Sequence, residues 1–161
     1  MQSVSSAHDI QRILQRCRTL AVVGLSAEAH RPSYFAAKYM LEHGYRIVPV
    51  NPKYPSILGQ RCFPSLEAID HPVDMVDVFR RPQDTPAIAE QAVAIGAKVL
   101  WLQLGVINEQ ARAIAAAGGL EVMQDRCVKI EHARFFGGRN YAGVNTGVIS
   151  ARRPLRTTPA A

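Results

Sequence analysis

The sequence alternates short apolar runs with amphipathic stretches at helical spacing, and this alternation restricts the possible folds more than any other feature. Short apolar runs cut by glycine or proline are typical of buried strands. Strands that alternate with helices of about ten residues indicate βαβ units, whose strands pair as a parallel sheet. We expect strands over 20–24, 45–50, 73–79, 99–104 and 120–124, and helices over 7–17, 32–43, 86–95 and 108–117, with a short last helix after Cys127.

The fold class predicted from this pattern is α/β, a doubly wound parallel five-stranded sheet with helices on both faces. The residues at the predicted boundaries agree with it. Pro32 suits the first turn of a helix, Gly44 suits a helix end, and Asn108 can cap the start of a helix. Within the long connection 53–73 we expect one short strand and one short helix.

Size and charge exclude several classes of protein. A chain of 161 residues fits one ordinary domain. Its formal net charge is +6, but three of those charges (Arg152, Arg153 and Arg156) lie in a C-terminal segment that we expect to be partly disordered, which leaves +3 elsewhere. This balance does not favour nucleic acid as the main ligand. No apolar run approaches the roughly 20 residues that span a bilayer, and no signal peptide is evident, so we expect a cytoplasmic protein without a membrane partner.

The sequence contains no recognisable catalytic or metal-binding motif. The cysteines Cys17, Cys62 and Cys127 are odd in number and have no CxxC spacing, and the five histidines have no ligand spacing. Asp74 and Asp77 fall three residues apart in a predicted strand, so they lie on opposite faces and cannot form a carboxylate pair. We therefore interpret Asp77 as structural and assign no catalytic residue.

In doubly wound sheets, ligands bind outside the carboxyl ends of the strands. The turn after the first predicted strand carries Gly24, Ser26, Arg31, Pro32 and Ser33. Glycine allows close approach of the backbone, a helix N-terminus offers free N–H groups, and serine and arginine add donors, which together suit a phosphate. The same residues would also form an ordinary glycine turn and helix start, because the motif is not G-x-G-x-x-G.

The end of the second predicted strand distinguishes between nucleotide cofactors. NAD-binding folds usually carry Asp or Glu at this place, whereas this sequence has Asn51, Pro52 and Lys53. A lysine would attract an additional phosphate on the ribose, which favours NADP or CoA over NAD or FAD. The alternative is a proline turn followed by a solvated lysine.

The remaining strand ends supply further candidates. An aromatic ring and a guanidinium could flank an adenine or a pyrophosphate, and a cysteine beside an arginine could form a mixed disulfide with a thiol cofactor. Each also has an ordinary interpretation as a buried ring, a solvated arginine or a small buried cysteine. The candidates are Phe79, Arg80 and Pro82 at the third strand end, Gln103 and Gly105 at the fourth, and Cys127 after the fifth.

Taken together, these segments resemble the small stand-alone CoA-binding protein family, which is related to the CoA-binding domain at the start of the succinyl-CoA synthetase alpha subunit. The resemblance rests on AVVGLS…HRPSY, GYRIVPVNPKY, LGQRCFPSLEAI, VDMVDVFRRP, AIGAKVLWLQLGVINEQA and MQDRCVKIEH. It implies a Rossmann-like fold over 1–135, coenzyme A as ligand, a cytoplasmic location and often a dimer, and it leaves 136–161 as a tail.

The resemblance also implies where the parts of CoA would bind. It places the pyrophosphate at Gly24, Ser26, Arg31, Pro32 and Ser33, the adenosine and its ribose phosphate near Asn51, Pro52 and Lys53, the adenine beside Phe79, Arg80 and Pro82, the pantetheine beside Gln103 and Gly105, and the thiol within reach of Cys127. The related ligases use a histidine that takes a phosphoryl group and is carried by a second domain. We see no such domain in this sequence and do not expect the ligase reaction.

Three functions remain open at this stage. The first is a CoA-binding or acyl-CoA-binding protein without catalysis of its own, acting as a carrier or a sensor. The second is an enzyme, either an NADP-linked reductase or an acyl-CoA enzyme that works with a partner. The third is a redox protein that forms a mixed disulfide with CoA at Cys127.

Overall fold

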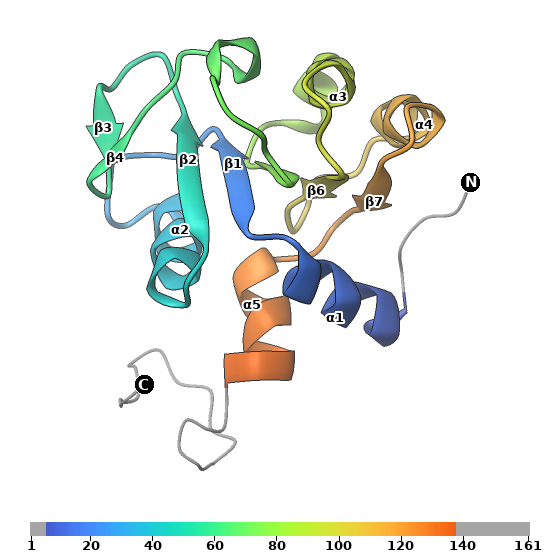
Figure 1. Ribbon diagram of the computed structural model, residues 1–161, viewed down its shortest axis with the longest axis horizontal. Coiled ribbons are helices and arrows are strands. Elements are labelled where there is room, and N and C mark those ends of the chain that lie inside the picture. Colours follow the sequence, from blue (N-terminus) through green and yellow to red (C-terminus); the bar gives the residue numbers. More distant parts are fainter. Residues whose placement is uncertain (1–5, 138–161) are drawn as a thin grey trace. The chain divides into compact units, whose positions relative to one another are not determined.

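The computed structural model describes residues 6–137 of the chain (Figure 1). The chain divides into two compact units, Met1–Val128 and Lys129–Ala161, and the sheet belongs to the first. All five strands of this sheet are parallel, in the order β2-β1-β5-β6-β7. They are β1 (Thr19–Val23), β2 (Arg46–Val50), β5 (Met75–Val78), β6 (Val99–Leu102) and β7 (Glu121–Met123). The predicted α/β fold is therefore confirmed.

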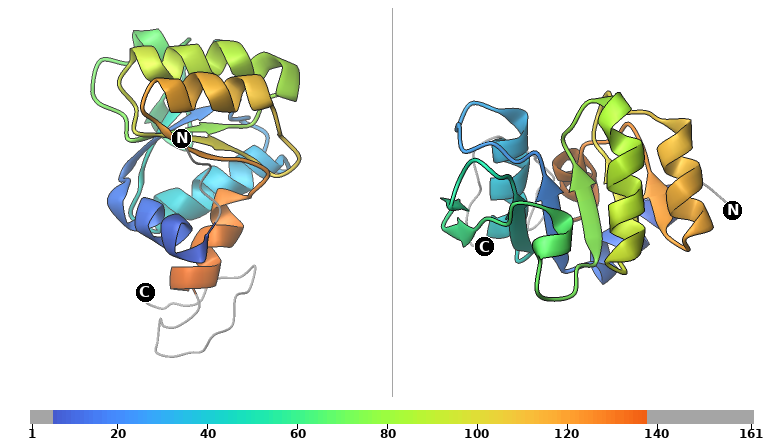
Figure 2. Two further views of the ribbon diagram at one scale, coloured as in Figure 1. Left: turned by 90° about the vertical axis from the view of Figure 1, so that its right-hand side faces the viewer. Right: turned by 90° about the horizontal axis from the view of Figure 1, so that it is seen from above.

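Helices of the first unit cover both faces of the sheet (Figure 2). On one face lie α3 (Thr85–Ala94) and α4 (Glu109–Ala117), and on the other lie α1 (Ala7–Arg16) and α2 (Pro32–Glu42). Strand residues alternate between these faces, which produces two apolar layers. One layer joins Ala21, Val76 and Leu100 of the strands to alanines of α3 and α4.

Short-range signals explain why the helices begin where they do. Pro32 occupies the first turn of α2, where its missing N–H costs nothing. The side chain of Asn108 accepts a hydrogen bond from the N–H of Ala111 at 2.9 Å and caps α4. Ser6 caps α1 in the same way through the N–H of Asp9. The expected starts of α2 and α4 are thus confirmed.

The structure refines the expected boundaries of several elements. The fourth strand ends at Leu102 rather than at 104, because the chain turns at once: the N–H of Val106 bonds the carbonyl of Gln103, and Gly105 has a φ of +85°. The connection 53–73 holds a hairpin of β3 (Ser56–Ile57) and β4 (Gln60–Arg61), followed by a single 3₁₀ turn, η1 (Leu66–Ala68).

The last elements are α5 (Val128–His132), as expected after Cys127, and a π-helical turn, η3 (Ala133–Gly137). The expected tail 136–161, which includes Arg152, Arg153 and Arg156, lies outside the described residues from 138 onward. Among residues 6–137, no helix combines the length and the apolar character needed to cross a membrane.

Candidate functional site

A cleft of about 660 Å³ lies at the carboxyl ends of β1, β5 and β6. This is the edge of a doubly wound sheet at which ligands bind. Three loops and the start of one helix form the wall. The lining residues are Gly24, Ser26, Arg31, Pro32, Ser33, Phe79, Arg80, Arg81, Pro82, Gln103, Leu104 and Val106.

Most of the residues singled out from the sequence meet in this cleft. Those brought together are Gly24, Ser26, Arg31, Pro32, Ser33, Phe79, Arg80, Pro82 and Gln103. The other candidates do not form part of its lining: Asn51, Pro52, Lys53, Gly105 and Cys127. The structure adds Arg81, Leu104 and Val106, which were not predicted from the sequence.

Gly24 brings the first strand end against the third. Its φ is +85°, and a Cβ atom at this position would lie 2.5 Å from the carbonyl oxygen of Phe79 and 2.9 Å from Cδ of Arg80. Such distances are too short for any side chain. The glycine therefore lets two loops of the cleft touch, which a larger residue with L chirality would prevent.

Two serines stiffen the loop between β1 and α2. The N–H of Ser26 donates to Oγ of Ser33 at 3.0 Å, and Oγ of Ser26 accepts from the N–H of Glu28 at 3.0 Å. Both bonds use the hydroxyl oxygens as acceptors, so within the described part of the chain the hydroxyl hydrogens stay available as donors. The loop is thus held in shape and keeps donors that suit an anion.

The cleft is lined by positive charge. Its lining contains Arg31, Arg80 and Arg81 and no Asp or Glu. Carboxylates lie just behind it: Arg31 pairs with Glu28 at 3.4 Å, and both other arginines pair with Asp84, at 3.1 Å for Arg80 and 3.3 Å for Arg81. Hydrogen bonds from Arg81 and then Arg80 hold the pKa of Asp84 below its usual range. Each of the three guanidinium groups is therefore paired with a carboxylate that is not part of the lining.

Asn51 does not line the cleft but holds one of the loops that form it. Its Nδ2 donates to the carbonyl of Leu25 at 2.9 Å, and its Oδ1 accepts from the N–H of Lys53 at 2.9 Å. The side chain thus ties the end of β2 to the loop after β1. Pro52 and Lys53 follow as exposed residues of this turn, so residues 51–53 adjoin the cleft without lining it.

A buried amide forms part of the cleft wall. Gln103 donates from Nε2 to Oδ1 of Asp77, and its Oε1 accepts from the N–H of Val128 at 3.3 Å. Cys127, half-buried, directly precedes Val128. The N–H of Gly105 donates to Asp125 Oδ1 at 2.7 Å. These bonds join the loop after β6 to the turn after β7, next to the cleft.

Arg81, Leu104 and Val106 were missed although each adjoins a selected residue. Arg81 follows Arg80 in the segment 79–82, and nothing in the sequence shows which of the two arginines faces a ligand. Leu104 is 66% exposed, which is unusual for leucine beside a buried strand. The available signal was that Leu104 lies between Gln103 and Gly105, two residues already selected.

The parallel five-stranded sheet and the cleft at its strand ends define this chain as a Rossmann-like α/β protein. The family model described as the CoA binding domain matches residues 18–133, and the chain belongs to this family. The resemblance seen in the sequence is thereby confirmed. The predicted domain boundary at residue 135 stays a prediction.

Similar proteins differ in how much of their length they share with this chain. An uncharacterized protein of Bacillus subtilis (strain 168), YneT, is 43% identical over 133 residues, which cover 83% of this chain and 98% of YneT. A solved structure, a hypothetical protein from Pyrococcus horikoshii OT3, has a TM-score of 0.81 and 39% identity, covering 85% of this chain and 98% of its own. The ADP-forming acetate–CoA ligase of Methanocaldococcus jannaschii is 25% identical over 81 residues, which are 50% of this chain and 12% of the ligase.

Proposed function

We propose that this protein binds coenzyme A or an acyl-CoA in the cleft at the strand ends, as a carrier or sensor without catalysis of its own. The observation that carries the proposal is the lining itself, in which three guanidinium groups surround a cleft without a carboxylate. CoA is a polyanion with a pyrophosphate and a ribose phosphate, and arginine is the side chain best suited to such groups. Membership of the CoA-binding domain family supports the same ligand.

The volume of the cleft is that of a typical small-molecule site, which supports the proposed ligand. Ligand sites commonly measure roughly 300–1,000 Å³, and the cleft falls within this range at about 660 Å³. We place the pyrophosphate between Gly24, Arg31 and the start of α2, because the positive end of the helix dipole and the Arg31 guanidinium both attract phosphate. The adenine lies beside Phe79, Arg80 and Pro82, the ribose phosphate near residues 51–53, and the pantetheine arm along Gln103 and Gly105.

The composition of the lining supports binding rather than catalysis. Among the described residues that form it there is no histidine, cysteine, aspartate or glutamate, so a general base for proton transfer is not at hand. The hydroxyl oxygens of Ser26 and Ser33 accept hydrogen bonds from the backbone N–H groups of Glu28 and Ser26, and these bonds involve no base. The cytoplasmic location and the dimer remain predictions.

The ligand is tested by calorimetric titration of the purified protein with CoA, dephospho-CoA, NADP and NAD. We expect CoA to bind most tightly and dephospho-CoA more weakly. A preference for NADP would favour a reductase, and turnover of an added acyl-CoA would favour an enzyme. A protein–CoA adduct at Cys127, seen by mass spectrometry after treatment with CoA disulfide, would favour the redox function. Binding of none of these would contradict the proposal.

Charge reversal tests the placement of the phosphates. We expect Arg31→Glu to weaken CoA binding tenfold or more, because a charge-assisted hydrogen bond contributes roughly 1.5–3 kcal/mol. Lys53→Glu should weaken CoA but not dephospho-CoA if Lys53 contacts the ribose phosphate. The matched control is Lys38→Glu, which makes the same kind of charge change at an exposed position of α2 outside the lining. Unchanged affinity in both Arg31→Glu and Lys53→Glu would overturn the site.

A further inference from the structure

A carboxyl group is buried in the centre of the sheet, directly behind the cleft wall. Asp77 lies on β5 between β1 and β6, opposite Val22 and Trp101, and is 2% exposed. Burial raises the pKa of this carboxyl to about 7, against the smaller opposing effect of the hydrogen bond from Gln103. A buried acid in an apolar layer destabilises a fold unless it has a partner, so its presence requires an explanation.

The partner of Asp77 is a residue that faces the ligand site. Gln103 follows β6, is 4% exposed and lines the cleft. Its Nε2 donates to Asp77, and its Oε1 accepts from the N–H of Val128. An amide could be turned by 180° about its last torsion, which would exchange the nitrogen and the oxygen. Because Asp77 accepts on one side and the N–H of Val128 donates on the other, only one orientation of the Gln103 amide makes both bonds.

These bonds leave part of the amide available. Nε2 carries two hydrogens and Oε1 two lone pairs. One of each is used by Asp77 and Val128, and within the described residues one hydrogen and one lone pair remain for a ligand. A fixed donor beside a fixed acceptor is the pattern that complements another amide.

We propose that Asp77 is a positioning residue, which holds the Gln103 carboxamide in the orientation that recognises an amide-bearing arm of the ligand. The proposal rests on the proposed function, because the pantetheine arm of CoA carries secondary amides with one N–H and one C=O each. Asp77 itself does not touch the ligand. Ligands that share the phosphates of CoA but lack this arm gain nothing from the Asp77–Gln103 pair.

The experiment compares two ligands on a set of variants. CoA and adenosine 3′,5′-bisphosphate, which lacks the pantetheine arm together with the outer phosphate of the pyrophosphate, are titrated into the wild type, Gln103→Leu, Asp77→Val and Asp77→Asn, and each variant is compared with the wild type for the same ligand. We expect CoA affinity to fall about fivefold in Gln103→Leu and Asp77→Val, the effect of one neutral hydrogen bond. Affinity for the bisphosphate should stay within about twofold. Asp77→Asn should keep the wild-type ratio, because an amide oxygen also accepts from Nε2.

A matched control separates positioning from stability. Asp74 lies just before β5, at the opposite end of the strand, and accepts from the backbone N–H groups of Arg18 and Thr19. Asp74→Ala should destabilise the sheet without changing the ratio of the two affinities. A purely structural Asp77 would behave like Asp74. Equal losses for both ligands, or unchanged CoA affinity in Gln103→Leu, would overturn the proposal.

A measurement on the wild type keeps the proposal testable if Asp77→Val does not fold. The side-chain amide signals of Gln103, identified by their loss in Gln103→Leu, should shift in the NMR spectrum when CoA is added and stay in place with the bisphosphate. Signals that do not move with CoA would overturn the inference alone. Absence of CoA binding to the wild type would instead overturn the proposed function.

Discussion

Gly24 is required for two reasons, its backbone conformation and the lack of room for a side chain. The position needs a φ of +85°, which costs a residue with L chirality about 1–2 kcal/mol. It also needs empty space, because the carbonyl of Phe79 lies where a Cβ atom would stand. Most glycines at turns satisfy the first requirement alone, so Gly24 should respond to substitution differently from them.

We expect Gly24→Ala to lower both stability and CoA affinity, since the loops that form the cleft must move apart. The control is Gly96→Ala, where φ is +77° and nothing lies within 4 Å of the new Cβ atom. Urea unfolding should reveal a loss in both variants, larger for Gly24→Ala, and calorimetry should reveal weaker CoA binding in Gly24→Ala only. Equal CoA affinity in the two variants would contradict this assignment.

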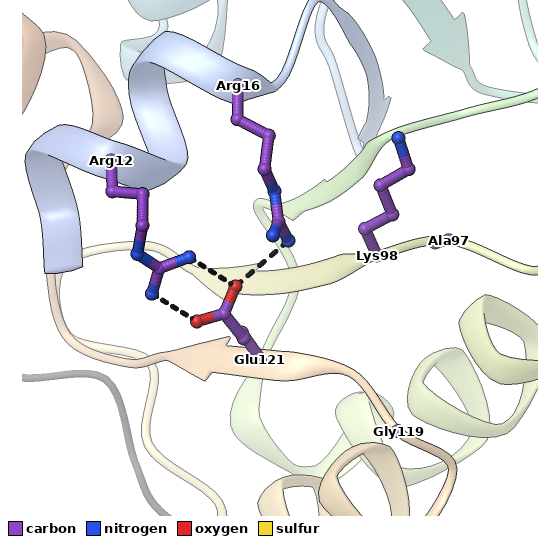
Figure 3. Close-up of a pocket in the computed structure, with 6 residues that line it drawn as sticks. All are labelled: Arg12, Arg16, Ala97, Lys98, Gly119 and Glu121. Carbon is purple, nitrogen blue, oxygen red and sulfur yellow. Dashed lines mark hydrogen bonds and ion pairs between the residues drawn. The ribbon is translucent and has the colours of Figure 1, made fainter.

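Helix α1 lies before the matched family segment, which begins at residue 18, and a charge cluster attaches it to the sheet. Glu121, at the start of β7, accepts hydrogen bonds from Arg12 at 2.5 and 3.1 Å and from Arg16 at 2.9 Å (Figure 3). The cluster borders a pocket of about 530 Å³ that also includes Lys98. The apolar side of α1 adds Ile10, Ile13 and Leu14, all buried.

The charge cluster predicts a pH-dependent contribution to stability. Hydrogen bonds from Arg12 lower the pKa of Glu121 from its ordinary value of 4.5. A carboxyl with a lowered pKa in the folded state stabilises the fold fully above its unfolded pKa, and this contribution is lost as the pH falls through the folded pKa. Glu121→Gln should therefore lower the free energy of unfolding at pH 7 by about 1 kcal/mol, as partly exposed ion pairs do.

The difference between Glu121→Gln and the wild type should shrink as the pH falls below 4.5, which urea unfolding at a series of pH values measures. Glu90→Gln, at an exposed position of α3, is the matched control and should differ little from the wild type at any pH. A difference for Glu121→Gln that stays constant down to the acid transition would mean that the charge of Glu121 contributes nothing.

For the molecule as a whole, the sequence predicted the elements well because their signals are local. Apolar runs marked all five strands, and Pro32 and Asn108 marked helix starts through contacts within a few residues. The order of the strands is different in kind, since β5 pairs with β1 across a long connection. No residue in that connection indicates that β5 will pair with β1.

The site residues also fall into those that local signals predicted and those that depend on contacts between distant segments. Residues directly after strand ends, such as Gly24 and Gln103, were predicted because topology alone brings those ends together. The sequence did not indicate that Arg81 lines the cleft and Lys53 does not, because this depends on how each loop turns after its strand. Nor was the bond between Gln103 and Asp77, which are 26 residues apart, or the pairing of Glu121 with Arg12 over 109 residues.

Ligand binding should raise the thermal stability of the whole fold, because a ligand that binds only the folded state shifts the unfolding equilibrium. At a free CoA concentration one hundred times Kd, the gain is about 2.7 kcal/mol, or roughly 5–10 °C in Tm for a chain of this size. Circular dichroism melts should show this increase for the wild type and Lys38→Glu. At the same CoA concentration, Arg31→Glu should show about half of this increase or less, because a tenfold higher Kd reduces the gain to about 1.4 kcal/mol. An equal increase with NAD would mean that the cleft does not distinguish the ribose phosphate, and the choice of CoA would be wrong.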